Sequence, residues 1–296
     1  MTPRKALILG STGQVGVELQ RSFAGYGEVR AYDRRQADLT HSEAVVEIIR
    51  QQQPTVVLLA AAYTAVDKAE SEPELAMAVN AEAPGRLARA CAESGALFVT
   101  YSTDYVFDGD KSEPWVETDA PDPLNMYGLS KLEGERRVRQ AGGRHLIFRT
   151  SWVYGSHGKN FFLTMLRLGK EREELGIVAD QVGGPTSSIA IAEATRAVVD
   201  RMESLSSAEA VARSGIYHMT CGGSTNWYEF ARHVFSECAG RLEGRQPRVR
   251  PLRTEDYPTP AKRPAYSVLN NEKLAQTWNV RLPAWQDAFA RVKESL

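Results

Sequence analysis

The alternation of short apolar runs with longer amphipathic stretches is the feature that most limits how this chain can fold. Through the first 150 residues, each apolar run is bounded by turn residues and followed by a stretch of helical periodicity. This order predicts βαβ units and an α/β fold with a doubly wound parallel sheet. We expect strands at residues 5–9, 28–32, 55–59, 96–101 and 145–150, and helices at 14–24, 42–52, 74–94 with a break near Pro84, and 126–140.

After Ser151 the rhythm loosens, which predicts a smaller second lobe. The expected division is a nucleotide-binding domain over 1–150 and a mainly substrate-binding lobe over 151–296, with some segments returning to the first domain. The basic, proline-interrupted stretch 241–264 predicts a loop. Further helices are expected at 161–170, 189–204 and 226–239, and short strands near 176–178 and 215–219.

Composition and charge exclude several classes of partner. The chain has 296 residues, 43% of them hydrophobic, and its 36 basic and 37 acidic residues give a net charge of -1. Neither nucleic acid nor a membrane is therefore an expected partner. Three cysteines without metal-like spacing favour reduced thiols and a cytoplasmic location. The five histidines lack ligand spacing, so no metal site is predicted.

A glycine-rich turn stands where the first predicted strand meets the first helix. Its spacing is G-x-x-G-x-x-G, which differs from the G-x-G-x-x-G of common dehydrogenases. Glycine there lets the backbone approach a pyrophosphate at the positive end of a helix dipole. The context predicts a Rossmann-type dinucleotide site, although such a turn can also bind nothing. The predicted contacts are Gly10, Thr12, Gly13, Gln14, Val15 and Gly16.

The residues after the second strand carry two competing signals about the cofactor. Asp33 suits the adenosine ribose hydroxyls of NADH, whereas Arg34 and Arg35 suit the 2′-phosphate of NADPH. We therefore expect either NADPH or NADH to be used. The alternative is a turn aspartate beside two solvated arginines. Further predicted cofactor contacts are Asp38, Leu39, Ala60, Ala62, Tyr63 and Thr64. The alanines among them could equally reflect tight packing.

Tyr127 and Lys131 are the predicted catalytic pair. They stand at i and i+4 at the start of a predicted helix, so they share a face. The ammonium is expected to lower the phenol pKa, letting Tyr127 protonate a carbonyl oxygen during hydride transfer. Thr103, at the end of a strand, is expected to donate a hydrogen bond to the same oxygen. Lys131 is also expected to hold the nicotinamide ribose, so both residues of the pair count as cofactor contacts.

Taken together, the glycine spacing, the strand-end Ser102-Thr103 and the Tyr-x-x-x-Lys pair resemble the extended short-chain dehydrogenase/reductase superfamily. A narrower resemblance, to the dTDP-4-dehydrorhamnose reductase family, spans nearly the whole chain. It rests on residues 63–70 (YTAVDKAE), 102–107 (STDYVF), 149–155 (RTSWVYG), 257–264 (YPTPAKRP) and 267–270 (SVLN).

This resemblance implies a reaction and a substrate. The family reduces the C4 ketone of dTDP-4-dehydro-β-L-rhamnose with NAD(P)H to give dTDP-β-L-rhamnose, the last step in making activated rhamnose for cell-envelope polysaccharide. The matching positions imply Thr103, Asp104 and Trp152 as contacts to the dTDP-sugar. An indole suits such a contact because it offers an apolar face to a 6-deoxy sugar and an N–H to its hydroxyls.

The chain departs from the family at one position that concerns assembly. Some members form a dimer through magnesium held by glutamates; Glu18 matches the first such position, but Ile189 stands at the second and cannot ligate a hard cation. A homodimer, if formed, is therefore not expected to be magnesium-bridged. Two other functions stay open: a cofactor-binding regulatory subunit resembling the β subunit of methionine adenosyltransferase, and another sugar-nucleotide reductase, epimerase or dehydratase.

Overall fold

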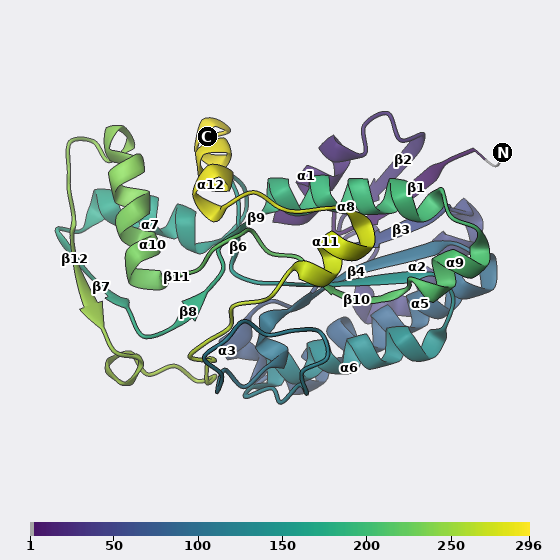
Figure 1. Ribbon diagram of the computed structural model, residues 1–296, viewed down its shortest axis with the longest axis horizontal. Helices are drawn as coiled ribbons and strands as arrows, with labels where there is room; N and C mark the ends of the chain where they lie inside the picture. The colour runs from purple at the N-terminus through teal and green to yellow at the C-terminus, as the bar shows by residue number, and fades with distance from the viewer. Residues whose placement is uncertain (1–2) are drawn as a thin grey trace.

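A six-stranded parallel sheet forms the centre of the molecule in the computed structural model, which describes residues 3–296 (Figure 1). The strand order is β10-β5-β4-β3-β1-β2, and every neighbouring pair runs parallel. The chain leaves β1 in one direction for β2 and then crosses to β3 on the other side, so a topological switch point lies at β1. This confirms the predicted α/β class. The strands are β1 (Lys5–Leu9), β2 (Glu28–Tyr32), β3 (Val56–Leu59), β4 (Leu97–Thr103), β5 (His145–Thr150) and β10 (Gly215–His218).

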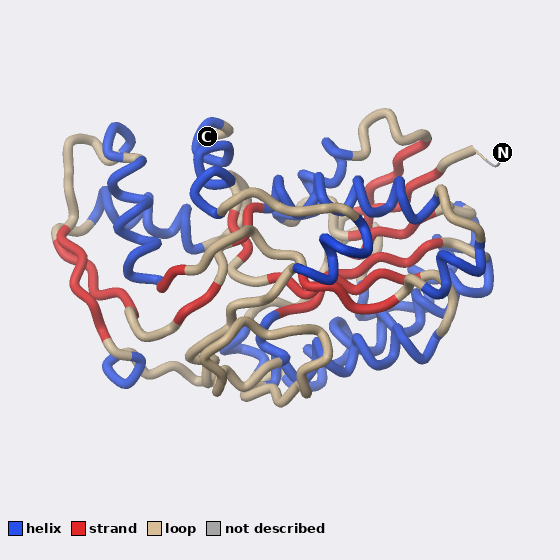
Figure 2. The backbone as a smooth tube through the Cα atoms, viewed as in Figure 1, coloured by secondary structure: helices blue, strands red, loops and turns tan. Residues whose placement is uncertain are grey.

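Both faces of this sheet are covered by helices, as Figure 2 shows. Alternate residues of β1 enter different cores: Ala6 and Ile8 pack with helices α1 and α8, and Leu7 and Leu9 pack with α2, α5 and α6. Burial on both sides explains why the strands read as unbroken apolar runs. The layer helices are α1 (Gln14–Ser22), α2 (Ser42–Gln52), α5 (Ala83–Ser94), α6 (Met126–Ala141), α8 (Ser188–Glu203), α9 (Ser207–Ala212) and α11 (Glu272–Trp278).

The helical stretch before β4 is continuous, and the predicted break near Pro84 takes the form of a π-helical turn. Helix α4 (Pro73–Met77) passes through η2 (Ala78–Glu82) into α5, which carries Pro84 in its first turn. A proline lacks the N–H and crowds the preceding turn, and the wider π turn accommodates it. The short elements of this half are η1 (Leu39–His41), α3 (Val66–Ala69) and η3 (Asp104–Val106).

A smaller lobe, at the left of Figure 1, has its own aromatic core. Tyr154, Phe162, Phe230 and Phe289 pack edge to face within it. Its elements are β6 (Val153–Tyr154), α7 (Phe161–Glu171), β7 (Glu174–Val178), β8 (Val182–Gly183), β9 (Thr186–Ser187), β11 (Thr225–Asn226), α10 (Trp227–Glu237), η4 (Ala239–Arg241), β12 (Arg248–Leu252), η5 (Thr254–Asp256) and α12 (Trp285–Glu294).

The prediction that residues 241–264 form only a loop is wrong. Strand β12 lies within this stretch and pairs in parallel with β7, from Arg248 opposite Glu174 to Leu252 opposite Val178. Pro251 is tolerated because the sheet has two strands, which leaves one side of each without a partner strand. The chain also returns to the central sheet after residue 150, since β10 is its sixth strand and α8 covers one face.

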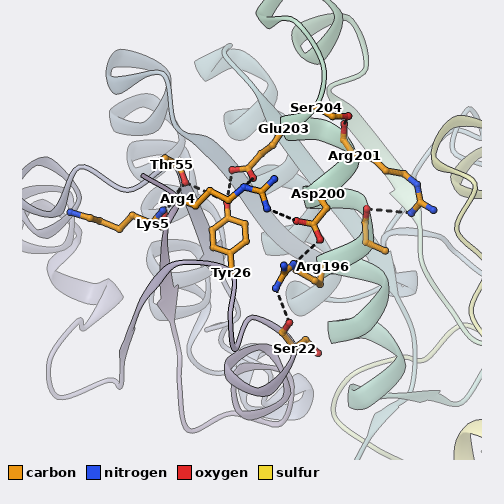
Figure 3. A network of polar contacts seen from close by, with 11 residues as sticks. Arg4, Lys5, Ser22, Tyr26, Thr55, Arg196, Asp200, Arg201, Glu203 and Ser204 are labelled. Atoms are coloured by element: carbon orange, nitrogen blue, oxygen red, sulfur yellow. Dashed lines mark hydrogen bonds and ion pairs between the residues drawn. The ribbon is translucent and has the colours of Figure 1, made fainter. Parts of the chain in front are cut away.

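A network of polar contacts fastens α8 to the amino ends of the central strands (Figure 3). Arg4, just before β1, reaches Asp200 at 3.1 Å and Glu203 at 3.2 Å, and Arg196 reaches Asp200 at 2.7 Å. The Tyr26 hydroxyl donates to Glu203, and Arg196 lies over the Tyr26 ring at 5.1 Å. We name these five residues the amino-edge network.

Candidate active site

A cavity of about 500 Å³ opens at the carboxyl ends of β1, β3 and β4. This is where the strand order reverses, the usual place for a ligand in an open α/β sheet. Most of the predicted site residues lie around this one cavity. Its lining includes the predicted residues Gly10, Thr12, Gly13, Gln14, Val15, Arg34, Asp38, Leu39, Ala60, Ala62, Tyr63, Thr64, Tyr127 and Lys131.

The glycine turn is shaped by close backbone contacts. Gly10 has φ +93°, and a Cβ there would lie 2.6 Å from the Ala61 nitrogen. A Cβ on Gly16 would lie 2.0 Å from the Gly10 carbonyl oxygen, so Gly16 supports the turn from beneath and does not line the cavity. Helix α1 begins at Gln14, and no side chain caps its N-terminus. The first N–H groups of the helix therefore stay available to an anion such as a pyrophosphate.

At the predicted adenosine end, Arg34 and Asp33 point to different uses. Arg34 lines the cavity, and its Nε lies 3.3 Å from Asp38 Oδ2. Asp33 does not line it, and its Oδ1 accepts hydrogen bonds from the backbone N–H groups of Arg35 at 2.9 Å and Gln36 at 3.1 Å. The hydrogen bond from the Thr40 N–H lowers the pKa of Asp38. Asp33 thus serves the turn, while Arg34 and Asp38 face the ligand space.

Asn80 links the cavity wall to helix α6, and it was not predicted from the sequence. Its side chain exchanges two hydrogen bonds with the backbone of Tyr63, both at 2.9 Å, and donates to Ser130 Oγ at 3.0 Å. The side chain is buried and lies in the π-helical turn η2. A single asparagine inside an apolar helical run is the signal that could have indicated it, because a buried amide needs partners.

Helix α6 brings the predicted catalytic pair to the cavity. Asn125 caps the helix, since its Oδ1 accepts a hydrogen bond from the Gly128 N–H at 2.8 Å. Tyr127 and Lys131 both line the cavity, together with Tyr101 and Ser102. The glycine turn lines the same cavity. The expected arrangement of phenol, ammonium and nucleotide-binding turn is therefore present in one cavity.

The prediction that Lys131 lowers the pKa of Tyr127 is wrong. Burial raises the pKa of Tyr127 to about 12, a hydrogen bond with the Thr103 side chain lowers it, and the Asp104 charge raises it. The Lys131 Nζ donates instead to the Tyr101 carbonyl oxygen. The phenol is therefore protonated at neutral pH, which is the form that an acid requires.

The three residues expected to touch a substrate occupy two places. Thr103 and Asp104 are buried at the end of β4, where Thr103 Oγ1 donates to Asp104 Oδ1 at 3.0 Å, and neither lines the main cavity. Burial raises the pKa of Asp104 to about 7, and hydrogen bonds with Ser267 and Thr103 oppose this.

Trp152 lies away from the cavity lining, in the wall of the smaller lobe. Its φ is +46°, a left-handed conformation that places the indole flat against Trp227, with ring centroids 3.5 Å apart. Strain at a non-glycine residue of this kind often marks a functional position. Trp227, the first residue of α10, was not predicted, because a tryptophan at a helix start carries no distinctive spacing.

Glu18 and Ile189, the two positions considered for a shared metal, have different surroundings. Glu18 is buried and accepts hydrogen bonds from Arg21 at 2.9 Å, with His157 Nε2 3.4 Å away. Ile189 packs against the apolar core of the smaller lobe. Within residues 3–296, no group of three or more His, Cys, Asp or Glu side chains is arranged to hold a metal ion. Over the same residues, no helix has the length and apolar character needed to cross a membrane.

Comparison with known proteins places the chain in a family. Residues 4–296 match the family model described as "RmlD substrate binding domain". The chain belongs to the RmlD family. RmlD relatives include the dTDP-4-dehydrorhamnose reductase of Burkholderia thailandensis, 49% identical over 96% of each chain, and that of Escherichia coli (strain K12), 44% identical over 98% of this chain and 97% of the other. The predicted family is therefore confirmed.

Solved structures agree with the RmlD assignment. A dTDP-4-dehydrorhamnose reductase from Bacillus anthracis in complex with NADP superposes with a TM-score of 0.90 at 34% identity, covering all of both chains. A UDP-glucose 4-epimerase from Thermus thermophilus in complex with NAD shares the fold, with a TM-score of 0.71 at 24% identity over 93% of each chain. The likeness to the epimerase concerns the fold.

Proposed function

We propose that this chain is an NAD(P)H-dependent oxidoreductase that reduces the C4 ketone of dTDP-4-dehydro-β-L-rhamnose to dTDP-β-L-rhamnose. The observation that carries the proposal is that Tyr127 and Lys131 line the same cavity as the glycine turn. The names of the RmlD relatives, at 41–49% identity for seven of them, support the substrate. The chemistry that such a site allows is proton donation beside a bound nicotinamide.

The cavity fits a dinucleotide. The backbone at Gly10 and Gly16 leaves no room for a Cβ, and the uncapped start of α1 suits a pyrophosphate. Gly10, Thr12, Gly13, Gln14 and Val15 would hold it, with Gly16 acting through the turn. Arg34, Asp38 and Leu39 would hold the adenosine, with Asp33 shaping their turn. Ala60, Ala62, Tyr63, Thr64, Tyr127 and Lys131 would hold the nicotinamide ribose.

Arg34 favours use of the phosphorylated cofactor without requiring it. A guanidinium pairs well with a 2′-phosphate. Asp38 lines the same cavity 3.3 Å from Arg34, and its carboxylate would accept a hydrogen bond from a ribose hydroxyl of NADH. NADH therefore also fits. We therefore propose that both NADPH and NADH serve as cofactors.

The proposed proton path uses three side chains. Bound NAD(P)H would supply the hydride. Tyr127, protonated at neutral pH because burial raises its pKa to about 12, donates a proton to the ketone oxygen. The Thr103 hydroxyl, which donates to Asp104 in this structure, would turn to donate to the same oxygen. Lys131 holds the ribose and places positive charge near the reacting centre.

The sugar nucleotide is proposed to lie between the catalytic helix and the smaller lobe. Thr103, Asp104 and Trp152 would contact it, the stacked Trp152 and Trp227 offering an apolar face for a 6-deoxy sugar. Residues 151–296 would thus supply most of the substrate-binding lobe.

Assembly and location follow from the same residues. We propose that a homodimer, where one forms, has no magnesium bridge, because Ile189 offers no oxygen ligand. The near-zero net charge argues against nucleic acid as a partner, and three buried free thiols fit a cytoplasmic enzyme.

The test is to mix the purified protein with NADPH and dTDP-4-dehydro-β-L-rhamnose and follow the absorbance of the reduced nicotinamide. Tyr127→Phe should lower kcat by about a hundredfold or more, the usual size of a lost general acid. Tyr217→Phe is the matched control, because the Tyr217 hydroxyl donates to the Arg213 carbonyl away from the cavity. No net loss of NADPH would indicate an epimerase, and equal turnover by native protein and Tyr127→Phe would refute the proposed acid.

A further inference from the structure

A buried charge cluster lies directly beneath the active-site cavity. The side chains of Glu135 and Arg149 are each 2% exposed. Arg149 Nε and Nη2 donate to the two carboxylate oxygens of Glu135 at 2.8 and 2.7 Å. Ser102 Oγ, from the end of β4, also donates to Glu135 Oε1 at 2.5 Å. We name these three residues the carboxyl-edge cluster.

The cluster is in register with the catalytic pair. Tyr127, Lys131 and Glu135 stand at i, i+4 and i+8 on α6, so their side chains follow one another along a single face of the helix. The Lys131 ammonium is held at the Tyr101 carbonyl oxygen, and Ser102 is the next residue of the chain. Glu135 therefore contacts the strand end that carries Thr103 and lies one helical turn behind the ammonium.

We infer that Glu135 is a positioning residue for the reduction, whose buried carboxylate keeps Lys131 charged and holds the Ser102-Thr103 end of β4 against the catalytic helix. The inference rests on the proposed function for its role in turnover. Arg149 fixes the carboxylate in place by its two parallel hydrogen bonds, the geometry that gives such pairs their directional strength.

The other groups around Lys131 leave Glu135 as the neighbour that stabilises the ammonium. Burial lowers the pKa of Lys131 to about 8, and the Glu135 charge opposes this. The group from β4 that contacts the Lys131 ammonium is the Tyr101 carbonyl, which carries no charge. On α6, the Tyr127 phenol is also uncharged at neutral pH. Asp104 lies toward Tyr127 and Thr103.

The remaining charges lie behind Glu135. Arg149, on β5, is paired with the Glu135 carboxylate. His218, on β10, is kept neutral because burial, together with the Arg149 charge, lowers its pKa to about 3. Removing the Glu135 charge should therefore make Lys131 lose its proton at a lower pH.

The experiment compares the pH dependence of kcat/KM for native protein and Glu135→Gln, since this profile reports groups of the free enzyme. The alkaline limb should move down by about half a pH unit or more, the size of one lost charge interaction. Glu133→Gln is the matched control on the same helix, because Glu133 pairs with Arg136 and Arg137 on the outer side. Its profile should coincide with that of the native protein.

A second readout does not depend on turnover. The rate at which acetic anhydride acetylates Lys131, measured by mass spectrometry across pH, reports the ammonium directly, and its midpoint should fall in Glu135→Gln. If the midpoint falls in Glu135→Gln but native protein does not reduce the sugar nucleotide, the proposed function fails while the charge coupling stands.

If Glu135→Gln does not fold, because it leaves Arg149 buried without its counter-charge, the double variant Glu135→Leu/Arg149→Met replaces both charges by apolar groups of similar size. The Lys131 midpoint and the alkaline limb should still fall. An unmoved midpoint in whichever of these variants folds would overturn the inference.

Discussion

Two ion-pair groups lie at opposite ends of the same sheet, and they differ in exposure and in what they hold. In the amino-edge network, Arg4 and Asp200 remain 45% and 38% exposed, and the contacts fasten α8 to the outside of the fold (Figure 3). In the carboxyl-edge cluster, the charges are almost fully enclosed, and they join β4, β5 and α6. Exposed ion pairs generally contribute little to stability, whereas removing one partner of a buried pair leaves an uncompensated charge inside the fold.

Breaking the buried pair should have the largest effect on stability. Arg149→Met leaves the Glu135 carboxylate enclosed without its counter-charge, which typically costs about 3–5 kcal/mol. Urea unfolding followed by circular dichroism would measure the change. A loss below about 1 kcal/mol would mean that the cluster is no more important to the fold than a surface pair.

Asp104 differs from both groups, because it is a buried carboxyl at the carboxyl end of β4 that has no paired cation. Its pKa is raised to about 7 from an ordinary value of about 3.9, so between these values the folded state binds more protons than the unfolded state. The stability that Asp104 contributes is therefore present at low pH and is lost as pH rises toward 7.

Asp104→Asn should remove this dependence. Relative to native protein, the variant should gain about 1 kcal/mol or more between pH 4 and pH 8, measured by unfolding at both values. Asp110→Asn, an exposed aspartate in the same connection, is the control and should leave the difference near zero. A constant offset between native protein and Asp104→Asn at all pH values would contradict the prediction.

The smallest effect is expected in the amino-edge network. Asp200→Asn removes the partner of Arg4 and Arg196 where all three side chains reach solvent, so the free energy of unfolding should change by no more than about 1 kcal/mol. Most of that change should disappear at high salt, because exposed pairs are screened. A loss comparable to that of Arg149→Met would erase the distinction between the two regions.

How much the sequence could predict depended on whether a feature was local. Five central strands and the residues around the glycine turn were predictable, because apolar runs and turn spacing are read directly from the chain. Strand β12 was not, since Pro251 and its basic neighbours resemble a loop until β7 is seen beside them. The segment 215–219 was expected to be a strand, but only tertiary structure shows β10 as the sixth strand of the main sheet.

The site shows the same limit. The i and i+4 spacing correctly predicted that Tyr127 and Lys131 lie on one face of a helix, and both line the cavity. The predicted sign of the Tyr127 pKa shift was wrong, because burial cannot be read from spacing. Asn80 and Trp227 were missed for a related reason. Their partners, Tyr63 and Trp152, lie far away in the sequence.

The place of β10 in the sheet has a consequence for how the protein is made. Its partner β5 is complete at residue 150, but β10 begins at residue 215, so a ribosome must add more than sixty further residues before that edge is covered. Until then β5 presents unpaired backbone groups that could join another chain. The nascent enzyme thus has a period of exposure to aggregation during synthesis, which ends only when β10, made after the first segments of the smaller lobe and after α8 and α9, closes the sheet.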